Sequence, residues 1–179
     1  MRPLALTLAL ALAALAGLQA QRATAPAAAA SPRLVVETAK GTIEIRLFRA
    51  EAPKTVEHLL GLVKRNFYRG LRVHRVTSSL AQFGDPLTRD MSQRAYWGSG
   101  GSGTRVGVAE FSKALTHQRG TVAFAHGGLP IMADSQLYIM KIASPSLDGK
   151  HVIIGQVTTG MDVVDRLAEA DLIKQISIK

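Results

Sequence analysis

The chain has 179 residues, no cysteine and a formal net charge of +9 at pH 7. The absence of cysteine excludes disulfides, thiol catalysis and thiolate metal sites, so a folded domain must be stable through packing alone. The positive charge favours contact with acidic surfaces, but the basic residues are scattered and form no dense run interleaved with aromatic residues. Nucleic acid is therefore not an expected partner.

The amino terminus has the composition of a secretory signal. A short basic start precedes a run rich in Leu and Ala over residues 4–20, and polar residues follow it. This pattern is typical of a signal peptide, and cleavage can follow either Ala20 or Ala25. The run falls short of the roughly 20 strongly apolar residues of a spanning helix, so stable membrane insertion is not expected, and a retained anchor is the alternative.

Composition divides the chain into three parts. Residues 1–25 are assigned to the signal peptide, residues 26–32 (Pro-Ala-Ala-Ala-Ala-Ser-Pro) to a linker, and residues 33–179 to one domain of ordinary size. The signal predicts an exported protein, with the periplasm as the expected compartment. We expect a monomer.

The domain begins with the pattern of a β-hairpin followed by a helix. Residues 34–38 and 42–48 flank a short turn that contains a glycine, and apolar residues at 43, 45 and 47 alternate with polar ones. The alternation predicts strands with one buried face. A helix is predicted from Pro53, because apolar residues recur at 56, 59, 60 and 63 and proline is favoured in a first turn.

The remainder of the domain reads as a long loop followed by short strands. Residues 87–113 are Gly-rich and weakly patterned, which is typical of a loop that crosses a barrel. A further helix is predicted after Gly160. The later predicted strands are residues 121–125, 136–141, 151–157 and 172–178. Without regular βαβ alternation, this pattern predicts a mainly β fold, a closed antiparallel eight-stranded β-barrel capped by two helices.

Several ordered motifs carry a resemblance to a known family. The segment Phe67–Val76 contains His74-Arg75-Val76, and Ala81-Gln82-Phe83-Gly84-Asp85-Pro86 follows it. The further motifs are Pro53–Val56, Gly120–Ala125, Asp134–Ile139 and Leu147–Val152. The chain resembles the cyclophilin family of peptidyl-prolyl cis/trans isomerases, whose Phe-His-Arg-Val, Gln-Gly-Gly-Asp-Pro and Leu-Asp-Gly-Lys-His-Val motifs occur in the same order.

The resemblance implies an enzyme that accelerates X-Pro isomerisation in proline-containing, unfolded or partly folded polypeptides, without cofactor or metal. It makes Arg75 the catalytic residue, and arginine suits this role because a guanidinium stays charged and offers several fixed donors. Gln82 and Gln136 would hydrogen-bond the substrate backbone. The rest of the implied substrate site is the strand segment Ala125, His126 and Gly127 and the walls of the proline pocket, Leu80, Tyr138, Leu147 and His151.

The chain departs from the family pattern in ways that leave alternatives open. The stretch between Arg75 and Gln82 is one residue shorter, so the family's pocket phenylalanine falls on Ser79 or is missing, and Ser146 stands where many members have a tryptophan. A less aromatic pocket buries less area, and about 1.4 kcal/mol is tenfold in rate. The alternatives are a peptide-binding or chaperone-like module with a weakly active pocket, a basic adaptor for acidic partners, and a purely structural ion pair for Arg75.

Two other sequence patterns, a glycine motif and the histidines, give weaker support for other kinds of binding site. Residues 98–103 match G-x-G-x-x-G, but no βαβ unit surrounds them, so dinucleotide binding is not expected. The corresponding loop of the family is also Gly-rich and borders the substrate groove. The five histidines show no H-x-x-x-H spacing, and a metal site is not expected. His58 and His117 are predicted to be surface residues.

Overall fold

The computed structural model describes residues 31–179. The predicted signal peptide and most of the predicted linker lie outside the described residues. Residues Ser31–Lys179 form one compact unit. No helix in this described part of the chain is long and apolar enough to cross a membrane.

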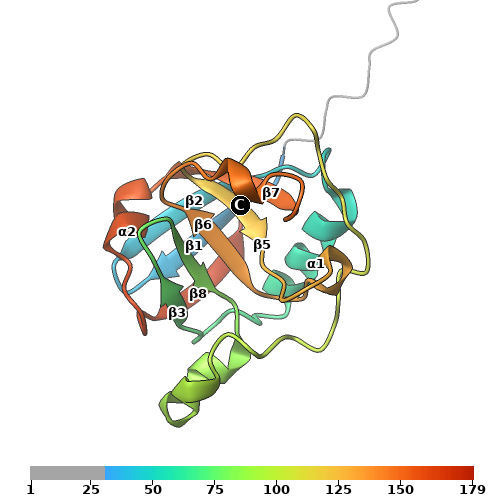
Figure 1. Ribbon diagram of the computed structural model, residues 1–179. Coiled ribbons are helices and arrows are strands. Elements are labelled where there is room, and N and C mark those ends of the chain that lie inside the picture. Colours follow the sequence, from blue (N-terminus) through green and yellow to red (C-terminus); the bar gives the residue numbers. More distant parts are fainter. Residues whose placement is uncertain (1–30) are drawn as a thin grey trace, which may run out of the picture. The chain divides into compact units, whose positions relative to one another are not determined.

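Eight antiparallel strands form a nearly closed barrel (Figure 1), as the sequence predicts. The strands are β1 (Arg33–Thr38), β2 (Gly41–Leu47), β3 (Val73–Val76), β4 (Leu80–Phe83), β5 (Thr121–Phe124), β6 (Leu137–Met140), β7 (Ile153–Thr159) and β8 (Ile173–Ile178). They follow the order β3-β4-β6-β5-β7-β2-β1-β8. The two outer strands approach each other through a bridge between Arg72 and Leu172 and a hydrogen bond from the Val73 N–H to the Asp171 carbonyl (2.9 Å).

The hairpin of β1 and β2 shows how the sequence builds one wall of the barrel. Ile43, Ile45 and Leu47 are buried, whereas the residues between them are partly or fully exposed, which confirms the predicted alternation. Gly41 turns the chain with φ +137°, and a Cβ atom there would lie 2.9 Å from Val163 of the second helix. A glycine is therefore needed both for the turn and for the close approach of that helix.

Helices α1 (Pro53–Lys64) and α2 (Met161–Arg166) lie on opposite sides of the barrel in Figure 1. The buried face of α1 includes Val56, Leu59, Leu60 and Val63, so the predicted helical spacing is confirmed. Glu110 holds the first turn of α1, because its carboxylate accepts from the backbone N–H of Thr55 (2.8 Å) and from the Thr55 hydroxyl (2.7 Å). A carboxylate at this end also complements the helix dipole.

The prediction of an irregular loop over residues 87–113 is wrong for the first part of that segment. Two short 3-10 helices, η1 (Pro86–Arg89) and η2 (Met91–Tyr96), form a projection at the bottom of Figure 1. Asp85 and Asp90 cap them, because their side chains accept from the backbone N–H of Leu87 and of Ser92. Short 3-10 helices that are held by a capping side chain have no periodic apolar pattern, so the sequence did not reveal these two helices.

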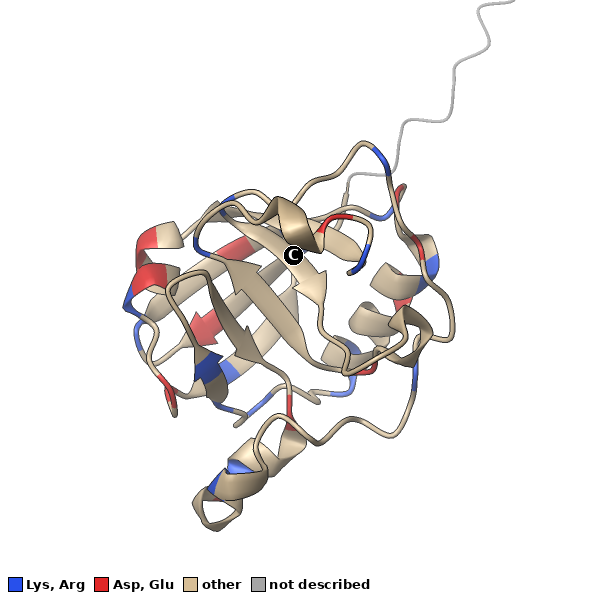
Figure 2. Ribbon diagram, viewed as in Figure 1, with Lys and Arg blue, Asp and Glu red and all other residues tan. Residues whose placement is uncertain are grey.

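The charged residues are distributed over the described surface, as Figure 2 shows. Several of them form exposed ion pairs, such as Arg94 with Glu169 (2.7 Å) and Arg119 with Asp165 (2.6 Å). Exposed pairs of this kind typically contribute only about 0.2 to 1 kcal/mol each. The stability of the domain therefore comes mainly from the apolar interior of the barrel.

Candidate active site

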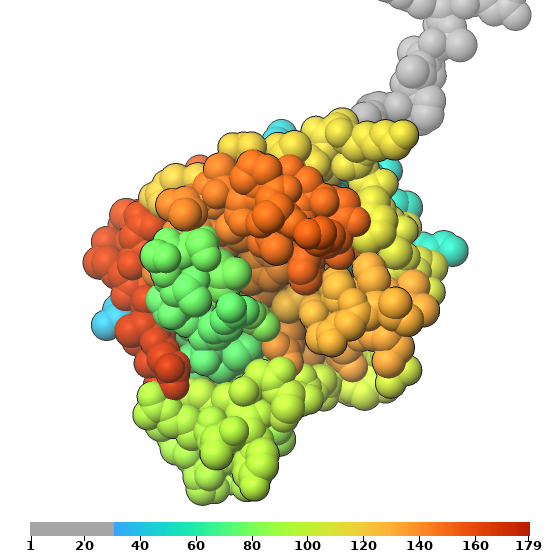
Figure 3. All heavy atoms as spheres, in the orientation of Figure 1, coloured from blue at the N-terminus to red at the C-terminus, as the bar shows by residue number. Residues whose placement is uncertain are grey.

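One pocket of about 790 Å³ brings all of the predicted site residues together. It lies where β4, β6 and the end of β5 meet the loops around residues 98–101 and 144–151. Figure 3 shows the surface hollowed between these segments. The predicted residues on its walls are Arg75, Leu80, Gln82, Ala125, His126, Gly127, Gln136, Tyr138, Leu147 and His151.

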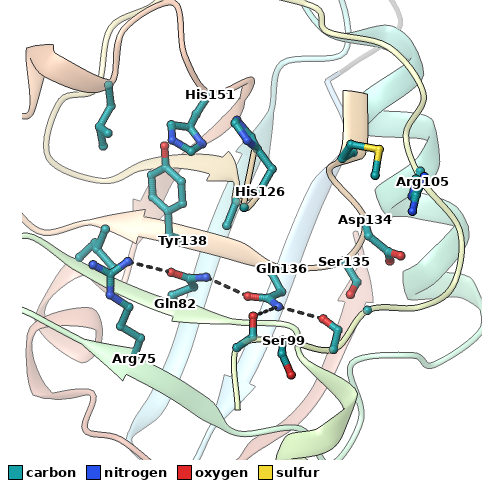
Figure 4. A pocket seen from close by; sticks show the side chains of 18 of the residues that line it. Arg75, Gln82, Ser99, Arg105, His126, Asp134, Ser135, Gln136, Tyr138 and His151 are labelled. Atoms are coloured by element: carbon teal, nitrogen blue, oxygen red, sulfur yellow. Dashed lines mark hydrogen bonds between the residues drawn. The ribbon is translucent and has the colours of Figure 1, made fainter. Parts of the chain in front are cut away.

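Arg75 projects from β3 at the edge of this pocket (Figure 4). Its backbone lies opposite that of Gln82 in the β3–β4 pair, and its guanidinium donates to the Gln82 side-chain oxygen at 3.4 Å. The residue is exposed and forms no salt bridge within residues 31–179. The structural ion pair considered for Arg75 is therefore absent from the described part of the chain, and the guanidinium keeps donors for a ligand.

Two glutamines connect Arg75 to the glycine-rich loop. The Gln82 side-chain N–H₂ donates to the Gln136 side-chain oxygen (2.9 Å), and the Gln136 N–H₂ donates to the carbonyls of Gly98 and Gly100 (2.8 Å each). Figure 4 shows this chain of hydrogen bonds along the floor of the pocket. The catalytic candidate and the loop that borders the groove are therefore held in fixed positions relative to each other.

Four backbone N–H groups of the glycine-rich loop are occupied by carboxylates of the protein itself. The Asp85 carboxylate accepts from the N–H groups of Gly98 and Gly100, and the Asp134 carboxylate accepts from those of Ser102 (2.7 Å) and Gly103 (3.1 Å). A dinucleotide-binding loop would instead leave such donors free for phosphate. The loop also follows a 3-10 helix rather than a strand, so its sequence match has a structural explanation.

An apolar slot forms one end of the pocket. Leu80 and Tyr138 are buried in a cluster of their own, and the partly buried Leu147 packs against that cluster. The Tyr138 hydroxyl lies 2.8 Å from Nε2 of His117, and Nδ1 of His117 lies 2.7 Å from the Asp148 carboxylate. A carboxylate only accepts, so the Nδ1–H donates to Asp148, and in the neutral imidazole Nε2 accepts from the Tyr138 hydroxyl.

The prediction that His117 is a surface residue is wrong. Its side chain is fully buried behind the slot, between Tyr138 and Asp148. The hydrogen bond from His117 holds the pKa of the Asp148 carboxyl below its usual range, and burial raises the pKa of Tyr138. His58 is only partly exposed, and its Nε2 donates to the Asp134 carbonyl at 2.6 Å. Both histidines brace the walls of the pocket from behind.

A pair of histidines covers the rim of the slot. The rings of His126 and His151 have centroids 4.3 Å apart. Nε2 of His126 donates to the Lys150 carbonyl (2.9 Å), and Nδ1 of His151 donates to the Phe124 carbonyl (3.2 Å), so backbone oxygens fix both rings. Burial, and then the neighbouring His126, lower the pKa of His151. Its ring is therefore neutral near pH 7 and presents an apolar face.

The edge of the pocket next to β5 is free to pair with an extended peptide. The Ala125 N–H still donates to the Gln136 carbonyl (2.9 Å), but the following residues 126–128 make no backbone hydrogen bond within the described part of the chain. Unpaired backbone at a strand end is the usual place for an added peptide strand.

The structure also places residues on the pocket that sequence reasoning did not assign. Ser79 does line the pocket, so no aromatic ring occupies the place of the family's phenylalanine, and Ser146 is not among the lining residues. Among the unassigned lining residues are Arg105, Met132 and Asp134. The signals for this end of the pocket were the glycines at 98–101 and the motif Asp134–Ile139, and neither marked Arg105 or Met132.

Comparison with known proteins agrees with this geometry. The family model described as cyclophilin type peptidyl-prolyl cis-trans isomerase matches residues 33–178. The fold is similar to the crystal structure of a Cryptosporidium parvum cyclophilin type peptidyl-prolyl cis-trans isomerase, with a TM-score of 0.70 and 24% identity over 82% of this chain and 96% of that chain. A second crystal structure of that protein, in the presence of the dipeptide Ala-Pro, gives a TM-score of 0.71. The chain belongs to the cyclophilin-type peptidyl-prolyl cis-trans isomerase family.

Two bacterial relatives are named for the same activity. A Helicobacter pylori peptidyl-prolyl cis-trans isomerase is 33% identical over 144 residues, which cover 79% of this chain and 83% of the relative. A probable peptidyl-prolyl cis-trans isomerase of Brucella suis is 34% identical over 160 residues, or 87% of this chain and 81% of the relative. The chain is thus a peptidyl-prolyl cis-trans isomerase whose substrates are proline-containing peptides, and the alternative of a peptide-binding or chaperone-like module with a weakly active pocket is not favoured.

Proposed function

We propose that this protein acts on X-Pro bonds in unfolded or partly folded polypeptides after export, as a monomer and without a cofactor, with Arg75 as its catalytic residue. The Leu- and Ala-rich run at residues 4–20 supports export. The open edge at residues 126–128 supports an extended substrate, because an extended chain can pair with free backbone whereas a folded surface cannot.

The reaction needs no covalent chemistry. Rotation about a peptide bond must break amide resonance against a barrier of roughly 18 to 20 kcal/mol, and uncatalysed X-Pro isomerisation takes tens to hundreds of seconds. When the imide twists, its nitrogen lone pair localises and becomes able to accept a hydrogen bond. A donor aimed at that nitrogen stabilises the twisted state more than the planar one, which lowers the barrier.

The position of Arg75 is the observation that carries this proposal. Its guanidinium lies at the edge of the pocket, is oriented by Gln82, and has no carboxylate partner in the described residues. The apolar slot of Leu80, Tyr138 and Leu147 provides a place for a proline ring. A proline held there would have its imide nitrogen beside a fixed cationic donor.

Replacing Arg75 by alanine tests the proposal. In an isomer-specific assay on a proline peptide, we expect kcat/KM to fall by about 100- to 1000-fold, the usual cost of removing one donor to a transition state. Peptide affinity should change much less, because the slot remains. Arg65→Ala is the matched control, since Arg65 is exposed and lies outside the pocket, and it should leave kcat/KM unchanged.

Two results would contradict the proposed role of Arg75. One is an Arg75→Ala variant as fast as the wild type, and the other is a loss of peptide binding in parallel with the loss of rate. The export part of the proposal is tested separately by sequencing the amino terminus of the protein recovered from the exported fraction. A terminus after Ala20 or Ala25 supports it, whereas an intact residue 1 indicates a retained anchor.

A further inference from the structure

The segment next to the pocket exposes three large apolar side chains within four residues. Leu129 is 64% exposed, Ile131 44% and Met132 40%. We call these three residues the apolar shelf. Met132 lines the pocket itself, so the shelf is continuous with the site described above. Exposed apolar groups gathered in one place usually mark a contact surface.

The apolar shelf is held rigidly. Ile131 and Met132 lie on the 3-10 helix η3 (Pro130–Met132), whose first residue is a proline with a fixed φ, and Leu129 immediately precedes it. Two hydrogen bonds attach it to the neighbouring segment, from the Val106 N–H to the Ala133 carbonyl (2.8 Å) and from the Gly107 N–H to the Ile131 carbonyl (3.1 Å). The backbone that carries these side chains is therefore fixed, and binding a ligand would cost little free energy for ordering this segment.

The free backbone of residues 126–128 leads directly to the shelf. These residues follow β5 and immediately precede Leu129 in the chain. A peptide paired along this edge, with its proline in the slot, would continue towards the shelf at about 3.3 Å per residue. Successive side chains of an extended peptide alternate between faces, so a residue a few positions from the proline can reach the shelf.

Polar groups border the shelf, because Asp134 lies two residues after Met132 and Arg105 precedes Val106, which is hydrogen-bonded to Ala133. Figure 4 shows Arg105 and Asp134 at the end of the pocket away from Arg75 and Tyr138. The Asp134 carboxylate is already engaged by the backbone of the glycine-rich loop. The pocket therefore has an apolar slot at one end and polar groups next to the shelf at the other, which fits a peptide with two separated apolar contacts.

We propose that the apolar shelf binds a large apolar side chain that flanks the proline of the substrate. This inference rests on the proposed function and specifies its substrate class: proline segments that carry Leu, Ile, Met or Phe a few residues away. Such segments are buried in folded proteins and accessible only before folding is complete. The shelf would then select incompletely folded chains by their exposed apolar residues.

Peptide pairs that differ at one position test the shelf. Each pair has the same central proline, with Leu in one peptide and Ser in the other at the second, third or fourth residue on either side. For the wild type, we expect at least one position at which Leu lowers the Kd and raises kcat/KM by about tenfold, the effect of burying part of one apolar side chain. In the Leu129→Ser/Ile131→Ser variant, this ratio should fall to about one.

The control is Ile178→Ser, because Ile178 is also 40% exposed but lies on β8 outside the pocket, and the Leu-to-Ser ratio should stay at the wild-type value. The proposed role of the shelf is overturned if the wild type does not prefer the Leu peptide to the Ser peptide at any position. It is also overturned if the Leu129→Ser/Ile131→Ser variant keeps the full preference for Leu. Isomerisation of every peptide without preference would leave the proposed function standing. A preference in Kd without isomerisation of any peptide would retain the shelf and contradict the proposed function.

Discussion

Tyr138 offers a sharp test of how the proline slot is built. Its hydroxyl is hydrogen-bonded to the buried Nε2 of His117 at 2.8 Å, and His117 is held in turn by Asp148. The change Tyr138→Phe keeps the aromatic ring and removes only this hydroxyl. Nε2 of His117, whose side chain is 0% exposed, would lose its hydrogen-bond partner.

The expected cost follows from that lost partner. A buried polar group left without a hydrogen bond costs about 1 to 3 kcal/mol, and the retained ring creates no cavity larger than one oxygen. For a domain of this size, 1 kcal/mol corresponds to a shift in Tm of about 2 to 4 °C. We therefore expect Tyr138→Phe to lower the free energy of unfolding in urea by about 1 to 3 kcal/mol. kcat/KM should stay within about threefold, since the slot keeps its wall.

A double-mutant cycle identifies the origin of the loss. In a His117→Leu background the buried nitrogen is absent, so adding Tyr138→Phe should cost little, and the two changes should couple by about 1 kcal/mol or more. A single-variant loss below about 0.5 kcal/mol, or full additivity of the two changes, would refute the reasoning that this hydrogen bond is a net contributor to stability.

Two further predictions concern pH and glycine. Burial lowers the pKa of both His74 and His151 from 6.5, so the unfolded chain binds more protons below that pH and the free energy of unfolding should decrease as the pH falls from 7 to 5. Urea unfolding at several pH values in this range measures the free energy of unfolding. The change His151→Gln should make that free energy depend less steeply on pH, and a wild-type free energy that does not change with pH would contradict the prediction. Gly84→Ala should destabilise by about 3 kcal/mol or more, because Gly84 has φ +110° and an added methyl group would collide with the Ser135 carbonyl. Gly61→Ala in α1, where the space is open, should stabilise by about 0.5 to 1 kcal/mol, and the reverse order of the two melting temperatures would refute the argument.

Local patterns in the sequence were sufficient for the hairpin and for α1. The alternation at Ile43, Ile45 and Leu47 and the helical spacing after Pro53 both report burial directly, and both elements are as predicted. The predicted site residues came instead from the ordered motifs of a family. No periodicity in the chain would have brought Arg75 and His151 to one pocket.

Features that depend on distant partners could not be predicted. His117 is buried because Tyr138 and Asp148, 21 and 31 residues further along the chain, satisfy both of its ring nitrogens. Taken alone, a histidine in a polar segment indicates a surface position. The apolar shelf is the converse case, since Leu129 and Ile131 have the composition of core residues and only the structure shows that nothing within the described residues covers them.

The pairing of β1 with β8 affects when this domain can fold. Leu34, near the start of the barrel, lies opposite Ile178, near its end, and Leu172, just before β8, forms the bridge to Arg72, just before β3. Such long-range pairing slows folding, because the intervening chain must be ordered before the contact forms. During synthesis the first hairpin has no neighbour on one side until the last strand leaves the ribosome. The barrel therefore cannot close along this seam until β8 has been synthesised, so the domain completes its fold only after its last strand is available.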